Sequence, residues 1–420
     1  MKFHHCFIFF AAAFSACAIS AEDVTRFRGI NSQGKFNEPG LLKKWPQEGL
    51  TPKWVNKDLG YGWSSVIKVK DRLYLNCLDA TDKNMESIVC LDLNGKKLWQ
   101  TQTGKIWAKS FSSPRSTPTY VEESGTGKLV VLTGSGEVCC LDSQSGKLLW
   151  KKEIAKTYQG KTGIWGYAES LVTHNGKVFA TPCGKKASIV AFNLKDGSVA
   201  WEAPSNGDKC AYVSPVIYKN QLIQVTGTHV FAVDIDSGRM LWENNYAEAV
   251  GTGRWKDINC ITPLLKDNQL FVTGGYNHGG VMYEIMPDGK GVKILWTNVD
   301  LDPHHGGVVE LDGKIYGSNW LNNKAGNWMS VDWKTGKTIY NDDWKKKGKG
   351  AIVSADGMLY LYEERRGTLG LVNPGNKLDV VSQFRIKYGS RQHWSHPTIS
   401  DGILYVRHGN ALGAFDLRKK

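Results

Sequence analysis

The chain has 420 residues, of which 41% are hydrophobic, and 53 lysines and arginines against 40 aspartates and glutamates, a formal net charge of +13. Beyond residue 21, no apolar run is long enough to cross a membrane as a helix, and no Cys-x-x-Cys pair of the kind that holds structural zinc occurs. The cationic surplus favours anionic surfaces, but the basic run Lys345-Lys346-Lys347-Gly348-Lys349 has no interleaved aromatic residue, so we interpret it as a solvated loop tip and expect no nucleic-acid binding.

Residues 1–21 have the composition of a secretory signal peptide. Lys2 precedes an apolar run from Cys6 to Ile19, and small residues stand before Glu22. We therefore predict export, with cleavage after Ala21 and a periplasmic or secreted protein. Lipid attachment at Cys17 is the less favoured alternative, because Phe14 is a poor first residue for a lipobox. Residues 22–50 are expected to form an N-terminal arm.

From residue 51 to 420, one pattern recurs along the chain. Each copy has a small residue, Asp or Asn two residues later, a turn with glycine, and an aromatic residue four positions after that glycine, as in "CCLDSQSGKLLW" and "FAVDIDSGRMLW". Alternating apolar residues around the turn predict a β-hairpin, and a second two-strand pattern precedes each copy. Four short strands per unit, at a spacing of 41 to 54 residues, indicate a β-propeller.

The outer-strand aromatic residues fix the number of blades. They are Trp54, Trp99, Trp150, Trp201, Trp242, Trp296, Tyr340 and Phe384. After Phe384 only three strands follow, whereas Trp54 precedes the first complete blade, so the strand of Trp54 is expected to complete the last one. This closure removes exposed sheet edges. The sequence thus predicts an all-β, eight-bladed propeller of four-stranded antiparallel blades as a single domain over residues 51–420, and we expect a monomer.

The repeat resembles the tryptophan-docking motif of the PQQ-like propellers, in the runs from Cys140 to Trp150 and from Ala232 to Trp242. That superfamily includes quinoprotein alcohol dehydrogenases and the propeller lipoprotein of the outer-membrane β-barrel assembly machinery. The segments "RFRGINSQG", "HHGGVVELDGKIYGSNW" and "HWSHPTISDGILYVRHG" look closer still to exported bacterial PQQ-like repeat proteins. The resemblance implies the fold, but propellers host many unrelated activities.

In propellers of this kind, the connection from one blade's outer strand to the next blade's inner strand opens on one mouth of the central channel. These connections are rich in aromatic and cationic residues that lie outside the repeat. The candidates for ligand binding are Trp63, Trp107, Arg115, Trp165, Tyr167, Arg254, Trp255, His304, His305, Arg391, His393 and Trp394. Indole faces bind sugar rings, quinones or apolar chains, and Arg and His bind anionic groups. The alternative is that the tryptophans only wedge between blades.

We predict no metal site. His304 and His305, if the segment is extended, point to opposite sides of the chain, and His393 and His396 also diverge on a strand. No carboxylate stands beside either pair in the sequence.

The quinoprotein resemblance implies a planar quinone between a tryptophan and a bridged cysteine pair, a calcium ion held by acidic and amide groups, and an aspartate base. The candidates here are Glu169 and Asp257 as acidic groups and Asn259 and Asn319 as amide ligands, and they match no family motif residue by residue. PQQ with calcium is therefore only the alternative cofactor set.

Seven cysteines follow residue 21, and two of them, Cys139 and Cys140, are adjacent. The repeat places Cys140 at the small position that Ala191 and Ala232 fill in other blades. Successive side chains of a strand leave opposite faces of the sheet, and a disulfide needs its Cβ atoms about 3.8 Å apart. We therefore predict that this pair packs inside a blade and forms no bridge.

Together these observations predict an exported propeller that acts through its channel mouth as a binding or scaffolding module. Its partner is expected to be an envelope protein or a small-molecule or carbohydrate ligand. The alternatives are a PQQ-dependent alcohol or sugar dehydrogenase and a propeller that binds or processes polysaccharide. No catalytic residue is assigned, and whether the protein is an enzyme stays open.

Overall fold

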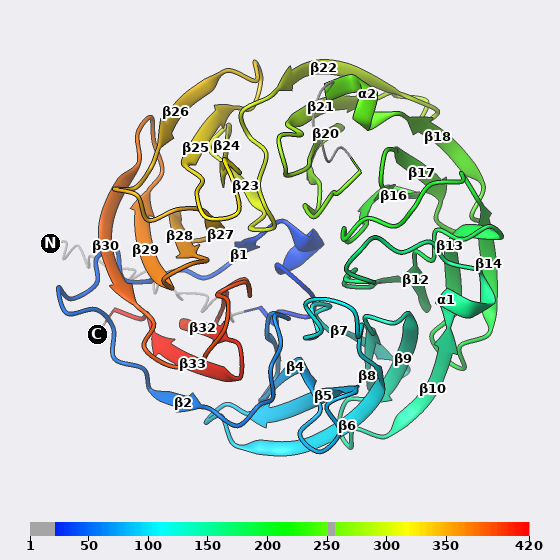
Figure 1. Cartoon of the computed structure of the whole chain (residues 1–420), viewed down its shortest axis with the longest axis horizontal. Coiled ribbons are helices and arrows are strands. Elements are labelled where there is room, and N and C mark those ends of the chain that lie inside the picture. Colours follow the sequence, from blue (N-terminus) through cyan, green and yellow to red (C-terminus); the bar gives the residue numbers. More distant parts are fainter. Residues whose placement is uncertain (1–21, 251–256, 420) are drawn as a thin grey trace, which may run out of the picture.

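The computed structural model describes residues 22–250 and 257–419, so the predicted signal peptide and the candidates Arg254 and Trp255 lie outside the described residues. Within these ranges the strands form eight sheets arranged as blades around a central channel (Figure 1). Each blade has four antiparallel strands, and the described helices are short. The predicted eight-bladed β-propeller is confirmed. In the described part of the chain, no helix has the length and apolar character needed to cross a membrane.

The first four blades run in chain order. They consist of β3 (Ile67–Val69), β4 (Arg72–Leu78), β5 (Met85–Asp92) and β6 (Lys97–Lys105); β7 (Thr119–Glu123), β8 (Thr126–Leu132), β9 (Glu137–Asp142) and β10 (Leu148–Glu153); β11 (Val172–His174), β12 (Lys177–Ala180), β13 (Ala187–Asn193) and β14 (Val199–Pro204); and β15 (Val216–Tyr218), β16 (Gln221–Val225), β17 (Val230–Asp234) and β18 (Met240–Asn244).

The remaining blades follow the same order. They consist of β19 (Leu264–Lys266), β20 (Gln269–Thr273), β21 (Gly280–Ile285) and β22 (Val292–Asn298); β23 (Val308–Leu311), β24 (Lys314–Ser318), β25 (Trp328–Asp332) and β26 (Thr338–Asp342); β27 (Gly350–Ala355), β28 (Met358–Glu363), β29 (Thr368–Asn373) and β30 (Asp379–Arg385); and β31 (Thr398–Ser400), β32 (Ile403–His408) and β33 (Ala411–Asp416), completed by β2 (Trp54–Asn56). The helices are η1 (Ile30–Ser32), α1 (Ile154–Thr157) and α2 (Tyr246–Val250).

The ring closes through β2, the outer strand of the last blade. Trp54 lies opposite Ala414 of β33, and Asn56 lies opposite Leu412, in an antiparallel pair. The Trp54 indole nitrogen donates a hydrogen bond to Leu93 O in the first blade, at 2.8 Å. The two ends of the propeller are thus joined by strand pairing, as the position of Trp54 predicts.

The repeated tryptophan and glycine hold neighbouring blades together. The indole nitrogen of Trp150 donates to Leu194 O of the next blade at 3.0 Å, and that of Trp201 donates to Ile235 O at 3.1 Å. The ring of Trp150 also covers Gly197, where a Cβ atom would stand 2.7 Å from the ring and where φ is +71°. Only glycine suits both the close approach and this backbone conformation, which explains why the two residue types recur together.

Cys139 and Cys140 lie in the regular strand β9. Cys140 stands opposite Trp150 of β10 and packs between the second and third blades. Cys139 packs on the other face, against the first blade, and both thiols are free and fully buried. The prediction that the pair serves packing is confirmed.

The first described residues of the chain enter the channel. Residues 22–38, which we call the arm, run through the middle of the ring, where η1 is visible in blue (Figure 1). β1 (Lys35–Phe36) pairs in parallel with β27, and an isolated bridge joins Val24 to Lys68. The arm therefore connects blades on different sides of the channel and fills part of its interior.

Candidate functional site

A cavity of about 860 Å³ opens at one mouth of the channel. Its walls come from two sets of connections, those from an outer strand to the next inner strand and those from the second to the third strand of a blade. Both sets lie at the same edge of the ring, because consecutive strands alternate in direction. The arm contributes Phe27 to the lining.

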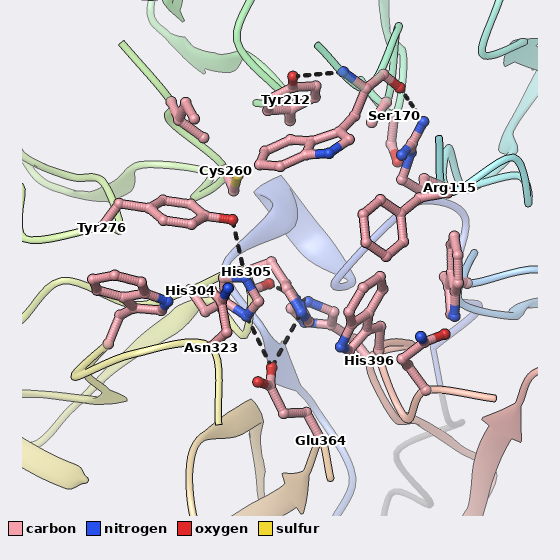
Figure 2. A pocket seen from close by; sticks show the side chains of 18 of the residues that line it. Arg115, Ser170, Tyr212, Cys260, Tyr276, His304, His305, Asn323, Glu364 and His396 are labelled. Atoms are coloured by element: carbon pink, nitrogen blue, oxygen red, sulfur yellow. Dashed lines mark hydrogen bonds and ion pairs between the residues drawn. The ribbon is translucent and has the colours of Figure 1, made fainter. Parts of the chain in front are cut away.

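Six aromatic rings follow one another in a closed circuit along the cavity wall. Each ring centroid lies between 4.4 and 6.4 Å from the next, in the order Trp394, Phe111, Trp165, Tyr276, His304 and His305. All six line the cavity, and Trp63 packs on Trp394 at 4.9 Å from outside this aromatic circuit. The cavity therefore offers ring faces and ring edges from several directions (Figure 2).

Three arginines add positive charge to this lining. Arg115 donates to Trp165 O, and its Nε is buried without a hydrogen-bond partner. Arg391 lies over the ring of Tyr61, 3.9 Å from its centroid, and donates to Ser113 Oγ at 3.0 Å. Arg365 lines the cavity beside Glu364. A ligand with an acidic group would find donors here.

The arm supports the cavity from inside the channel. Arg28 is buried and donates to Ile352 O at 2.9 Å and to Val308 O at 2.5 Å. Its guanidinium also donates to His396 Nδ1 at 2.9 Å, and His396 Nε2 donates to His305 O at 2.9 Å. The arm thereby fixes the backbone of one member of the aromatic circuit.

His304, His305 and Glu364 form a cluster on one side of the cavity (Figure 2). Glu364 Oε2 lies 3.1 Å from His304 Nδ1 and 3.2 Å from His305 Nε2. Tyr276 Oη is hydrogen-bonded to His304 Nε2 at 3.0 Å. Burial and the neighbouring His305 lower the pKa of His304 to about 4, so this ring is neutral at pH 7.

This cluster corrects the expectation that the two histidines diverge and lack a carboxylate partner. The segment is bent at His304 and His305 and is not an extended strand. At Gly306 this bent segment passes so close to the seventh blade that a Cβ atom would stand 1.8 Å from Gly350 O. Because of the bend, the two rings lie 4.4 Å apart on the same side of the chain.

The basic run at 345–349 is also corrected in part. Lys345 and Lys346 are exposed, but the side chain of Lys349 is only 1% exposed. Its Nζ lies 2.9 Å from Glu364 Oε1 and donates to Asn322 O at 2.9 Å. Lys349 is thus an internal ion-pair partner of the cluster.

Of the sequence-predicted site residues, seven line the cavity. They are Trp63, Arg115, Trp165, His304, His305, Arg391 and Trp394.

Seven other predicted residues are described but do not line the cavity. Three of them have buried side chains that bond within the blades: Tyr167 donates to Pro182 O, Glu169 accepts from Thr181, and Asn259 donates through Nδ2 to Thr226 O, while its Oδ1 is buried without a hydrogen-bond partner among the described residues. The others are Trp107, which packs over Gly166; Asp257, paired with Lys209; Asn319, which accepts from Asn327 N; and His393, stacked on His408.

Sequence reasoning missed several lining residues. Phe111 and Tyr212 stand in connections from an outer strand to the next inner strand, but nothing in the neighbouring sequence marks them as lining residues. Tyr276, Trp320 and Glu364 stand in connections from second to third strands, which meet the same mouth. Because consecutive strands alternate in direction, the sequence could have predicted that this second set of connections lies at the same mouth.

Comparison with known proteins yields two kinds of relative. A family model described as outer membrane protein assembly factor BamB matches residues 84–342. Polyvinylalcohol dehydrogenase of Sphingopyxis sp. (strain 113P3) is 23% identical over 381 residues, which cover 66% of this chain and 58% of that protein. Outer membrane protein assembly factor BamB of Moranella endobia (strain PCIT) is 25% identical over 205 residues, covering 47% of this chain and 46% of that protein.

The chain therefore spans about half the length of the curated relatives that it matches. Among solved structures, BamB from Moraxella catarrhalis superposes with a TM-score of 0.62 at 15% identity, covering 88% of this chain and 98% of that chain. At this level of identity, the likeness establishes the shared fold.

Proposed function

The chain belongs to the family described as outer membrane protein assembly factor BamB, and from this premise we propose that it is an exported binding module that acts through its channel mouth. Its ligand is a ring-containing molecule with an acidic group. The closed aromatic circuit around the cavity is the observation that carries this proposal.

The dimensions and chemistry of the cavity support such a ligand. A volume of about 860 Å³ falls within the range of small-molecule sites, which are mostly apolar with a few polar groups. Aromatic faces contribute to the binding of rings, and arginines bind carboxylates or phosphates through paired hydrogen bonds. Arg115 and Arg391 line the same cavity as the aromatic circuit and would bind the acidic group.

The residues do not reproduce the quinone clamp of the quinoprotein dehydrogenases. Cys260 is the cysteine that lines the described cavity, whereas Cys139 and Cys140 are buried on opposite faces of β9. Of the proposed acidic and amide groups, Glu169 and Asn259 are engaged in the blades and stand outside the lining. A dehydrogenase that holds PQQ in this way is therefore not supported by these side chains.

A protein partner at the mouth is a second candidate function, and the rim of the cavity favours it. Phe111, Ile164 and Leu321 are large apolar residues with exposed fractions of 45%, 59% and 53%. They stand in connections at the mouth, where apolar exposure marks binding surfaces. An envelope protein covering this rim would fit the family of the chain.

The ligand proposal is tested by tryptophan fluorescence. Purified protein is titrated with aromatic carboxylates, PQQ and acidic oligosaccharides. We expect saturable quenching by at least one class, weakened at least about tenfold in Trp165→Leu, since loss of a ring contact and its buried area costs more than about 1.4 kcal/mol.

Trp99→Leu is the matched control, because Trp99 stands on the outer strand β6 and does not line the cavity. This variant should bind as the wild type does. Equal loss in both variants, or no saturable binding by any class, would refute the ligand proposal.

The partner candidate is tested by a photo-crosslinking residue at position 164 in living cells. Position 93, in the turn between the third and fourth strands of the first blade and thus away from the mouth, is the control. A discrete protein recovered from position 164 and absent from position 93 is the expected result. Identical recovery from both positions would count against this candidate.

A further inference from the structure

Three potential metal ligands converge on the cavity wall from two blades. The ligand atoms of His304, His305 and Glu364 all lie within 4.8 Å of one another, and all three residues line the cavity. We propose that His304 Nδ1, His305 Nε2 and Glu364 Oε2 bind a divalent transition-metal ion such as zinc.

The donor set selects the class of ion. Calcium takes six to eight oxygen ligands, and magnesium also prefers oxygen, whereas imidazole nitrogen suits zinc, cobalt, nickel and copper. Two imidazoles and one carboxylate therefore favour a transition metal over the calcium ion of the quinoproteins.

The separations of the carboxylate oxygen from the two imidazole nitrogens are close to those around an ion of this class. A zinc–nitrogen bond of about 2.1 Å and a tetrahedral angle place two ligand atoms about 3.4 Å apart. The observed separations from Glu364 Oε2 are 3.1 Å to His304 Nδ1 and 3.2 Å to His305 Nε2. Three protein ligands leave a further coordination position, and this position would face the cavity.

The surrounding groups orient the donors. Tyr276 Oη is hydrogen-bonded to His304 Nε2, and because a tyrosine hydroxyl also accepts, Nε2 can carry the ring proton while Nδ1 binds the ion. Lys349 Nζ forms an ion pair with Glu364 Oε1, so that Oε2 is the oxygen that faces the two histidines. His305 Nε2 is buried and has no hydrogen-bond partner of good geometry among the described residues.

The proposal is tested with protein that carries no histidine tag and has been stripped of metal with a chelator. We expect it to take up one equivalent of cobalt(II), with the visible absorption of a low-coordinate site, and one equivalent of zinc that displaces the cobalt. His304→Ala and His305→Ala should each weaken this uptake at least about tenfold.

His174→Ala removes a histidine at the end of β11 and should leave the uptake unchanged. Unchanged uptake in both His304→Ala and His305→Ala would overturn the proposal, as would stoichiometric binding of calcium without zinc.

If neither variant folds, X-ray absorption on zinc-loaded wild-type protein decides the matter. A shell with two imidazoles and oxygen supports the site, and a sulfur or all-oxygen shell refutes it. Because no organic ligand is present, the result is independent of whether the cavity binds an acidic ring compound.

Discussion

Glu169 shows how burial changes the behaviour of a single side chain. The sequence makes it a candidate acidic group, but its side chain is buried just before β11, the inner strand of the third blade. It accepts hydrogen bonds from Thr181 N and Oγ1, each at 3.0 Å. Burial raises its pKa to about 8. The folded protein therefore keeps this carboxyl protonated near neutral pH.

This pKa predicts a dependence of stability on pH. An unfolded glutamate titrates near pH 4.3, so between about pH 4.3 and 8 the folded state binds a proton that the unfolded state releases. The stabilisation from this group is complete at low pH and is lost as the pH rises to about 8. We expect the Glu169→Gln variant, whose side chain stays neutral, to melt a few degrees higher than the wild type at pH 8. Its melting temperature should also fall less between pH 5 and pH 8 than that of the wild type.

Thermal melts at pH 5, 6, 7 and 8 measure this difference. Glu248→Gln, at an exposed carboxylate, is the control and should follow the wild-type profile. A decline in Glu169→Gln as steep as that of the wild type would contradict the prediction.

At the residue scale, the sequence predicted the mouth aromatics better than the charged cluster. Trp63 and Trp394 stand out because they fall outside the repeat. Glu364 follows a hairpin strand in a run of charged residues, where a solvated turn is the ordinary expectation. Its burial depends on Lys349 from another connection and on the bend at Gly306, and neither contact has a local signature.

At the element scale, the blades follow the periodicity of the sequence closely. The turn glycine and the tryptophan place each outer strand, and Cys140 occupies the small position opposite Trp150. Since alanine fills this position in other blades, we expect Cys140→Ala to change the free energy of unfolding by less than about 1 kcal/mol. Cys140→Leu should cost about 1–3 kcal/mol, because the added carbons meet a packed core.

Urea denaturation of the two variants checks this expectation. If Cys140→Ala destabilised the protein as much as Cys140→Leu, the assignment of a packing role would be wrong.

The arm is the element whose structure the sequence did not predict. Its position inside the channel depends on Arg28, whose donors meet carbonyls of two blades and His396. We expect Arg28→Ala to cost about 2–4 kcal/mol, because several buried acceptors lose their partner, and to speed proteolysis within residues 22–38.

Lys35→Ala is the control on the same arm, since Lys35 is 40% exposed and its ion pair with Glu310 is worth at most about 1 kcal/mol. Denaturation and limited proteolysis measure both variants. Equal effects would show that burial of Arg28 does not hold the arm.

At the scale of the whole molecule, closure of the ring covers a sheet edge that would otherwise be free. β2 covers the free edge of β33, and an uncovered edge is a template for pairing with another chain. Proline lacks a backbone N–H and therefore cannot donate a hydrogen bond across the β2–β33 pair. We therefore expect Val55→Pro to associate at micromolar concentration.

A chain that begins at residue 40 lacks the arm but keeps β2, and it should remain monomeric. Size-exclusion chromatography with light scattering distinguishes the two. A monomeric Val55→Pro protein would contradict the role assigned to closure.

The arm also constrains the order in which the molecule can fold. Arg28 and His396 are 368 positions apart in the chain, and both the Arg28–His396 contact and the pairing of β2 with β33 need the last blade. Contacts between such distant positions form slowly, because a large loop must close first. The Arg28–His396 contact therefore forms only after the last blade has been synthesised. A chain that is still being synthesised cannot complete its ring. The ring of such a protein stays open until its final blade has been synthesised.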